Sequence, residues 1–222
     1  MTTPAPSSLF AAEFLTHVVE LGVEHIVLAP GARSQALALV AAELERRGDV
    51  KLHVRIDERA AGFLALGLAV ESRMPAVVIT TSGSAVANLH PAVLEAHHAG
   101  VPMILLTADR PEELREIGSN QTTHQHDIFG PAVRLSVDEP APVPGATAER
   151  RGYELAEAAF YAATDFYAPG PVHLNLGFRE PLSSASEVRP CDLIINVMRH
   201  VEPGISVELE QGPRTIVIAG AD

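Results

Sequence analysis

Two short apolar runs constrain the fold of this chain more than any other feature. Residues 76–80 (AVVIT) and 101–107 (VPMILLT) contain no charged side chain, and each is followed by a polar turn. A strand that is apolar on both faces must be covered on both faces, and this is typical of parallel sheets flanked by helices. The two runs therefore predict buried strands in the middle of a parallel sheet.

Other segments extend this pattern along the chain. Further strands are predicted at residues 25–29, 52–56 and 170–176. Helical periodicity is predicted between them, over residues 8–21 with Ser8 as the N-cap, 35–47, 57–70, 85–98 and 146–163. Strands that alternate with helices at this spacing indicate βαβ units. We predict an α/β fold with a doubly wound, mainly parallel sheet and helices on both faces.

The C-terminal part of the chain reads differently. Residues 1–182 carry the α/β pattern, whereas residues 183–212 begin with a Ser-rich stretch that suits a linker. Residues 213–222 contain another apolar run, which we interpret as the first strand of a further domain. A single strand cannot bury itself. We therefore expect the chain to be part of a longer protein.

The composition limits the kinds of partner. The formal charge is −12 with only 16 Lys and Arg residues, which argues against nucleic acid, because phosphate binding requires clustered basic residues. No apolar run approaches the roughly 18 residues of a membrane span. The single cysteine cannot form an internal disulfide, and no apolar signal segment begins the chain, so we expect a cytoplasmic protein.

Polar side chains gather in the predicted turns that follow four strands. These turns are residues 30–34, 57–59, 81–84 and 109–111. In an open α/β sheet, ligands bind where strand ends turn into helices. If the turns share one edge, they combine Glu58 with Arg33, Arg110 and several hydroxyl groups. Arginine suits a carboxylate or phosphate, so a small acidic substrate is implied, although a surface ion pair remains the alternative for each arginine taken singly.

Two interpretations are open for Glu58. Asp57 is a good N-cap, and the helix after it is so rich in apolar residues that we expect it to be packed on nearly all sides. Glu58 would then lie close to an apolar interior, where a carboxylate needs a partner. The alternative is that Glu58 only complements the helix dipole. The polar, aperiodic stretch 118–126 is interpreted as a binding loop.

Several common sites are missing from the sequence. It contains neither G-x-x-x-x-G-K-[ST] nor G-x-G-x-x-G after a strand, so nucleotide binding has no direct support, and it contains no G-x-S-x-G elbow. The histidines at 97–98 and at 124 and 126 do not have the spacing of two ligands on one helix face. We therefore predict no metal ligands within this chain.

Taken in order, these motifs resemble a known family. Residues 30–34, 56–59, 62–69, 81–89 and 106–111 are similar to the pyrimidine-binding domain of thiamine-diphosphate enzymes. Within that superfamily they most resemble the menaquinone-pathway synthases, which decarboxylate 2-oxoglutarate and add the resulting succinyl-semialdehyde carbanion to isochorismate. Residues 118–121 and 170–173 strengthen the resemblance, which covers about residues 10 to 182.

The resemblance implies roles for particular residues. Glu58 matches the catalytic glutamate that hydrogen-bonds the pyrimidine N1′ of the cofactor. The positions that match those lining the pyrimidine ring are Pro30, Thr81 and Ser84. The positions that match the substrate-binding residues are Arg33, Arg110 and Gln121, with Asn120 adjacent. Ala32 stands where the family usually has serine, which puts one substrate hydrogen bond in doubt.

The resemblance also implies what lies elsewhere. Thiamine diphosphate and Mg²⁺ are expected to need a Gly-Asp-Gly…Asn site in a C-terminal domain that this sequence does not contain, and residues 48–50 are no substitute. Members of the superfamily are at least homodimers, so we expect self-association as a homodimer or homotetramer, and the piece alone is expected to be inactive. Two alternatives remain open: another thiamine-diphosphate-dependent 2-oxoacid decarboxylase or carboligase, or a non-catalytic α/β binding module.

Overall fold

One all-parallel sheet organises the chain. The computed structural model describes residues 4–144, 147–184, 188–189 and 191, and within them six strands pair in the order β2-β1-β3-β4-β6-β5. The strands are β1 (His25–Leu28), β2 (Lys51–Val54), β3 (Ala76–Thr80), β4 (Met103–Asp109), β5 (Ser136–Glu139) and β6 (Pro171–Gly177). The helices are α1 (Pro6–Glu20), α2 (Gln35–Arg47), α3 (Glu58–Ser72), α4 (Ser84–Ala87), α5 (His90–Ala99) and α6 (Thr147–Ala163), with short 3-10 turns η1 (Glu112–Leu114) and η2 (Gly130–Ala132).

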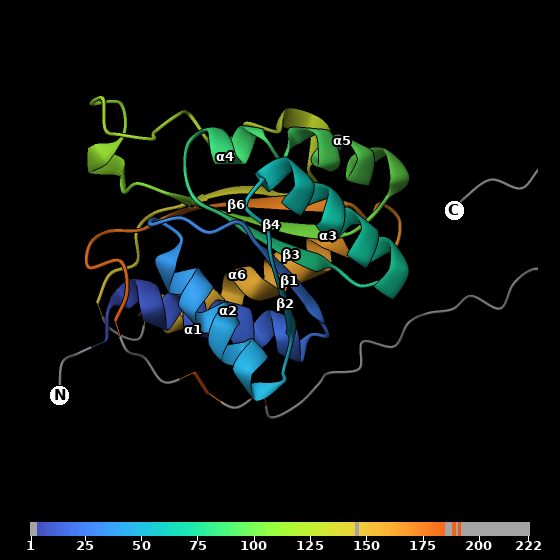
Figure 1. Ribbon diagram of the computed structural model, residues 1–222, viewed down its shortest axis with the longest axis horizontal. Coiled ribbons are helices and arrows are strands. Elements are labelled where there is room, and N and C mark those ends of the chain that lie inside the picture. Colours follow the sequence, from blue (N-terminus) through green and yellow to red (C-terminus); the bar gives the residue numbers. More distant parts are fainter. Residues whose placement is uncertain (1–3, 145–146, 185–187, 190, 192–222) are drawn as a thin grey trace, which may run out of the picture.

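Helices cover both faces of this sheet, as Figure 1 shows. Helices α1, α2 and α6 pack on one face, and α3, α4 and α5 pack on the other. The predicted doubly wound α/β fold is therefore confirmed. The resulting domain has two apolar cores separated by the sheet.

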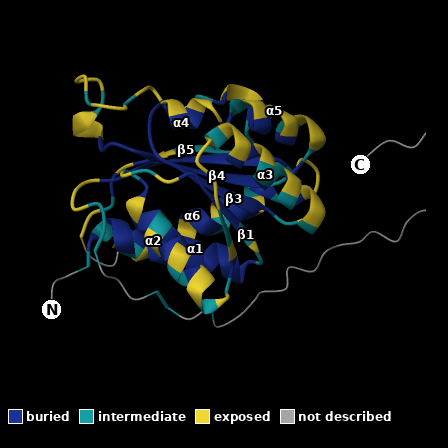
Figure 2. Ribbon diagram, in the orientation of Figure 1, coloured by how far each residue is buried: buried dark blue, intermediate teal, exposed yellow. Residues whose placement is uncertain are grey.

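The continuous apolar runs supply both cores at once. In β3, the side chains of Val77 and Ile79 join the core under α1, α2 and α6, whereas those of Ala76 and Val78 join the core under α3 and α5. All of β3 and β4 is buried, as Figure 2 shows in dark blue. Successive side chains of a strand point to opposite faces, so residues 76–79 of β3 and 103–106 of β4 are apolar on both sides of the sheet.

Two helix predictions were wrong in detail. Helix α1 begins at Pro6 with Ala5 as its N-cap, because proline suits the first helical position; Ser8 is not the cap. The Ser8 hydroxyl instead accepts a hydrogen bond from the Ser184 N–H at 2.9 Å. The single helix predicted over residues 85–98 is two helices, with α5 starting anew just before Pro91, which has no N–H to continue α4.

Within a single copy of the chain, the helix after Asp57 is not packed on nearly all sides as predicted. The buried face of α3 consists of small residues such as Ala61 and Ala65, which let the helix approach the sheet closely. Phe63 and Val70 on its outer side are 42% and 57% exposed. Strand β2 also ends earlier than predicted, at Val54, and Ile56 is 84% exposed. The outer side of α3 and the segment after β2 therefore each carry exposed apolar side chains.

The predicted linker is described only at its start. Arg189 forms ion pairs with Glu13 and Glu20 on α1, and Val188 and Cys191 pack against the core beneath that helix. The remainder of 183–212 and the strand predicted within 213–222 lie outside the described residues, so both stay predictions. No helix in the described part of the chain has the length and apolarity needed to cross a membrane.

Two glycines in helices allow a matched test of the packing. Alanine normally stabilises a helix over glycine by up to about 1 kcal/mol. At Gly152 in α6, however, a Cβ would lie 2.8 Å from the Phe10 carbonyl oxygen of α1, whereas at Gly67 in α3 nothing lies within 4 Å. We expect Gly152→Ala to destabilise the chain by about 1–3 kcal/mol and Gly67→Ala to stabilise it. Urea unfolding measures both changes, and a stable Gly152→Ala variant would contradict the close approach of α1 and α6.

Candidate functional site

The polar turns lie together at one edge of the sheet. They follow the carboxyl ends of β1, β2, β3 and β4, and because all strands are parallel these ends point the same way. The register keeps the ends level: Leu28 pairs with both Val54 and Ile79, and Thr80 pairs with Thr107. The structure thus brings the turns to the edge where open α/β sheets bind ligands.

Two of these turns touch. A Cβ on Gly31 would lie 2.3 Å from the Cβ of Thr81, so only glycine lets the first turn approach the third this closely. The Ser34 hydroxyl donates to the Gly31 carbonyl oxygen at 3.1 Å and closes the first turn. Thr81 is buried, whereas Pro30 and Ala32 are exposed at the rim. The contact fixes Pro30 relative to Thr81.

A second set of contacts joins the third turn to Arg110 and to the loop after β4. The Arg110 guanidinium donates to the Ser82 hydroxyl and, at 2.7 Å, to the Gln121 carbonyl oxygen. Gln121 returns a bond from its Nε2 to the Ser82 carbonyl oxygen at 3.1 Å. Ser84 and Asn120 are exposed beside these contacts. The predicted residues Arg110 and Gln121 therefore meet at the turn that holds Thr81 and Ser84.

The two predicted arginines are not neutralised by carboxylates. Arg110 is buried and Arg33 is half-buried, and within the described ranges neither forms an ion pair with Asp or Glu. Arg33 instead donates to the Phe178 carbonyl oxygen at 3.1 Å. Burial lowers the pKa of Arg110, and the nearby charge of Arg33 lowers it further. Two cations held by neutral acceptors make this edge attractive to an anion.

Glu58 begins α3, but it does not lie in the interior. Asp57 caps the helix by accepting the Ala60 N–H at 2.8 Å, as predicted. Glu58 is half-buried, and the hydrogen bond to its carboxylate within the described part of the chain comes from Asn88 Nδ2, at 3.5 Å. This long bond leaves carboxylate lone pairs available to a ligand.

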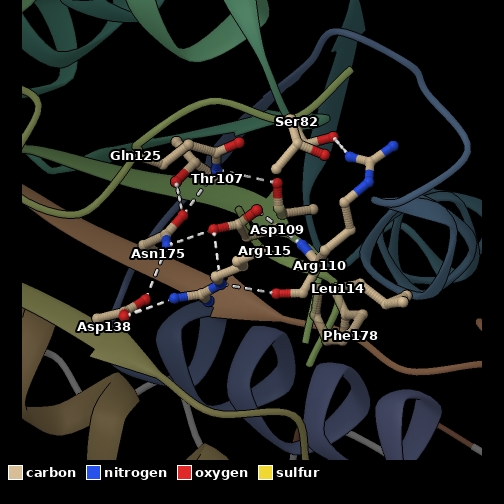
Figure 3. Close-up of polar contacts among 12 residues, drawn as sticks. Ser82, Thr107, Asp109, Arg110, Leu114, Arg115, Gln125, Asp138, Asn175 and Phe178 are labelled. Atoms are coloured by element: carbon tan, nitrogen blue, oxygen red, sulfur yellow. Dashed lines mark hydrogen bonds and ion pairs between the residues drawn. The ribbon is translucent and has the colours of Figure 1, made fainter. Parts of the chain in front are cut away.

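The sequence did not indicate the most buried polar group at this edge. Gln125 and Asn175 are 1% and 0% exposed, and they hydrogen-bond each other through Gln125 Nε2 and Asn175 Oδ1 at 2.8 Å. Figure 3 shows them with Thr107, Asp109 and other neighbours. A polar residue inside the apolar strand at 171–176 was a signal for Asn175. Gln125 lies in an aperiodic loop, where no pattern distinguishes it.

His173 lies within the same buried group. Its Nε2 is 2.8 Å from the Thr107 hydroxyl, and its Nδ1 has no partner in the described part of the chain. Burial lowers the pKa of His173 to about 4. The side chain is therefore neutral at pH 7, and protonation would place an unsolvated charge between the two layers.

A cavity of about 310 Å³ lies beside this group rather than at Glu58. Its lining includes Asp109, Arg115, Gln125 and Asp138 but not Glu58, Arg33 or Arg110. Among the described residues, no group of three or more His, Cys, Asp or Glu side chains is placed to hold a metal ion. The cavity is therefore separate from the edge at which Glu58, Arg33 and Arg110 lie.

An all-parallel α/β domain with interlocked polar turns at its carboxyl edge is a small-molecule-binding domain. The comparisons with known proteins specify which one. Residues 10–129 match the family of thiamine pyrophosphate enzymes, N-terminal TPP binding domain, and the chain belongs to this family.

Curated relatives are similar over nearly the whole chain. Proteins from Leifsonia xyli subsp. xyli, Clavibacter michiganensis subsp. michiganensis and Kineococcus radiotolerans are 54%, 53% and 52% identical to it over 99%, 98% and 97% of its length. Each is named 2-succinyl-5-enolpyruvyl-6-hydroxy-3-cyclohexene-1-carboxylate synthase. The chain spans 38% to 39% of the length of these relatives.

The buried histidine predicts a particular pH dependence of stability. An unfolded histidine has a pKa near 6.5, whereas that of folded His173 is about 4, so the unfolded chain binds the proton more tightly. The neutral side chain of His173 contributes its full stabilisation above pH 6.5. As the pH falls from 6.5 to 4, the free energy of unfolding decreases, by about 3 kcal/mol in total.

We expect His173→Gln to reduce the slope of unfolding free energy against pH in that window, measured by urea unfolding. The exposed His98 provides the control, and His98→Gln is expected to keep the slope of the unsubstituted chain. An unchanged slope in His173→Gln would contradict burial of a neutral imidazole.

Proposed function

We propose that the protein acts as a 2-succinyl-5-enolpyruvyl-6-hydroxy-3-cyclohexene-1-carboxylate synthase, which decarboxylates 2-oxoglutarate on thiamine diphosphate and joins the remaining carbons to isochorismate in menaquinone biosynthesis. The names of the relatives support this reaction. The observation that carries it is the pair Arg33 and Arg110, two guanidinium groups held by neutral oxygen atoms, with Arg110 in contact with Gln121. Both proposed substrates are carboxylates, which suit such a site.

Glu58 is the proposed catalytic residue. Thiamine diphosphate, when bound, supplies an acidic thiazolium carbon whose proton is removed with the help of the cofactor's own aminopyrimidine. The Glu58 carboxylate fits the pyrimidine because its lone pairs are largely free and it lies on the same edge as Thr81. It would hold a proton at the pyrimidine N1′, and such positioned acid–base catalysis contributes about 10²–10⁴-fold in rate. Pro30, Thr81 and Ser84 are proposed to line the ring.

Arg33, Arg110, Asn120 and Gln121 are the proposed substrate-binding residues. Arg110 is fixed by Ser82 and by the Gln121 carbonyl oxygen, so its free N–H groups have a defined direction. Ala32 is exposed next to Arg33 and offers no hydroxyl, so we infer that this position contributes contact but no side-chain hydrogen bond.

Diphosphate and Mg²⁺ are proposed to bind outside this chain. None of the described residues form a group suited to a metal, and the relatives extend well beyond the part that this chain matches. We further propose that the chain forms a homodimer or homotetramer in which the exposed apolar side chains of Val54, Ile56, Phe63 and Val70 pack against a second copy. These side chains are 42% to 84% exposed. Their exposure in a single copy supports burial in an assembly. We propose a cytoplasmic location.

Glu58→Gln in the complete natural protein is expected to lower kcat by about 10²-fold or more, because glutamine cannot hold the proton that the pyrimidine nitrogen shares. The assay follows decarboxylation of 2-oxoglutarate with and without isochorismate. If 2-oxoglutarate is decarboxylated but the reaction does not depend on isochorismate, the protein is another 2-oxoacid carboligase. If 2-oxoglutarate is not decarboxylated at all, the protein is a binding module.

The control for Glu58→Gln is Glu149→Gln. Glu149 also lies in the first turn of a helix, α6, so both changes remove the same interaction with a helix dipole. Only Glu58→Gln is expected to reduce kcat. Equal turnover in the two variants would show that Glu58 only complements the dipole of its helix.

Arg33→Ala is expected to raise the KM for an acidic substrate by about 10- to 100-fold, the worth of a charge-assisted hydrogen bond, with cofactor affinity nearly unchanged. Steady-state kinetics and cofactor titration measure the two quantities. Arg150→Ala, at an exposed position on α6, is the matched control. Loss of cofactor affinity instead would place Arg33 at the cofactor.

A further inference from the structure

The amide of Gly83 depends on a single side chain. Gly83 is buried with φ +83° and ψ −142°, a backbone conformation suited to glycine. Its N–H donates to Gln125 Oε1 at 2.8 Å and has no backbone acceptor in the described part of the chain. A buried N–H without a partner is destabilising, so the conformation of the 81–84 turn depends on how the Gln125 amide is oriented.

The orientation of that amide is determined by a chain of donors and acceptors. Asn175 Nδ2 donates to Asp109 Oδ2 at 2.9 Å and to Asp138 Oδ1 at 2.7 Å (Figure 3). Ionised carboxylates only accept hydrogen bonds, so the Asn175 NH₂ must face them and its Oδ1 must face Gln125. That oxygen accepts from Gln125 Nε2, which leaves Gln125 Oε1 facing Gly83.

Both ends of this series of hydrogen bonds are fixed as well. Arg115 pairs with Asp109 at 3.2 Å and with Asp138 at 2.7 Å. Burial raises the pKa of Asp138, but hydrogen bonds from Arg115 and Asn175 lower it overall, so the carboxylate stays ionised. Gln125 Nε2 also donates to the Ala108 carbonyl oxygen at 3.2 Å. Both hydrogens of the Gln125 NH₂ group are thus hydrogen-bonded. If the carboxamide were reversed, its oxygen would face the oxygen atoms of Asn175 and Ala108.

The same series of hydrogen bonds extends to Arg110, one of the proposed substrate-binding residues. Asp109 Oδ1 accepts the backbone N–H of Arg110 at 2.7 Å, and the Arg110 guanidinium bonds the Ser82 hydroxyl next to Gly83. A closed path therefore runs from Asp109 through Asn175 and Gln125 to Gly83, and back through Ser82 and Arg110. Its members are buried, which strengthens each hydrogen bond and raises the cost of breaking one.

We propose that Gln125 is a positioning residue: the polarity of its carboxamide, imposed by Asp109 and Asp138 through Asn175, holds the 81–84 turn and Arg110 in register with each other. The inference rests on the proposed function, in which this turn contacts the cofactor and Arg110 contacts the substrate. Displacement by about 1 Å can cost 10²-fold in rate.

The test uses Gln125→Met and Gln125→Glu in the complete natural protein. Methionine keeps the volume but removes every hydrogen bond, and an ionised glutamate removes both donors, so kcat is expected to fall by about 10- to 100-fold in each. Protonated glutamate has one donor and one acceptor oxygen, as the amide does. The kcat of Gln125→Glu relative to wild type is therefore expected to rise from pH 8 to pH 6, while that of Gln125→Met stays flat. Dividing by the wild-type kcat at each pH corrects for the pH dependence of the reaction itself.

A purely structural role is excluded by a control matched for stability. Leu155→Ala removes a buried side chain of α6 on the other face of the sheet and is expected to lower Tm without lowering kcat. The positioning role is overturned if folded Gln125→Met keeps kcat within twofold of wild type. It is also overturned if Leu155→Ala loses as much kcat at equal Tm, or if the relative activity of Gln125→Glu does not change with pH.

A second measurement separates this proposal from the proposed function. In the 222-residue chain, amide hydrogen exchange of Gly83 is expected to be at least about 10-fold faster in Gln125→Met, because its acceptor is gone, while exchange of Val78 in β3 is unchanged. If the unsubstituted protein lacks synthase activity but Gly83 responds in this way, the proposed function fails and the positioning of the turn stands. Unchanged exchange of Gly83 overturns the positioning.

Discussion

The covering of a parallel sheet on both faces is the constraint on which the rest of this structure depends. Buried strands such as β3 and β4 are apolar over most of their length, and their polar residues, Thr80, Thr107 and Asp109, come near the carboxyl ends. Polar groups are displaced to the turns, and parallel order places the turns after successive strands at one edge. The same topology therefore buries the sheet and brings four residues together at one edge: Arg33, Glu58, Thr81 and Arg110.

The fold was predictable to the extent that it follows from periodicity. The strand at 76–80 and the helix at 35–47 were predicted with the observed bounds, because a continuous apolar run and a helical stripe ending in a left-handed glycine are local signals. Strand β5 was missed because it lies at the edge of the sheet and carries Ser136 and Asp138, so it has no apolar run.

The site was predictable only in part, and for a physical reason. The sequence placed Arg110 at a strand end and Gln121 in a polar binding loop, and the structure brings these two together. The family resemblance, not periodicity, supplied the role of Glu58, which is half-buried in a single copy of the chain because α3 fully buries only its small residues. Gln125 acts through Asn175, which is distant in sequence, so their contact exists only in the folded chain. Local patterns cannot reveal a residue whose role depends on such a contact.

Two arginines in the segment after β4 show how the same side chain serves opposite purposes. Arg115 faces Asp109 and Asp138, so its charge is neutralised and its effect is structural. Arg110 is more buried, yet its guanidinium is held by a hydroxyl and a carbonyl oxygen, which orient it without cancelling its charge. A carboxylate at this position would stabilise the folded chain more but would compete with an anionic ligand. The absence of a carboxylate partner for Arg110 within the described part of the chain therefore lowers the stability of the fold but leaves the guanidinium free to bind an anion, as is common at functional sites.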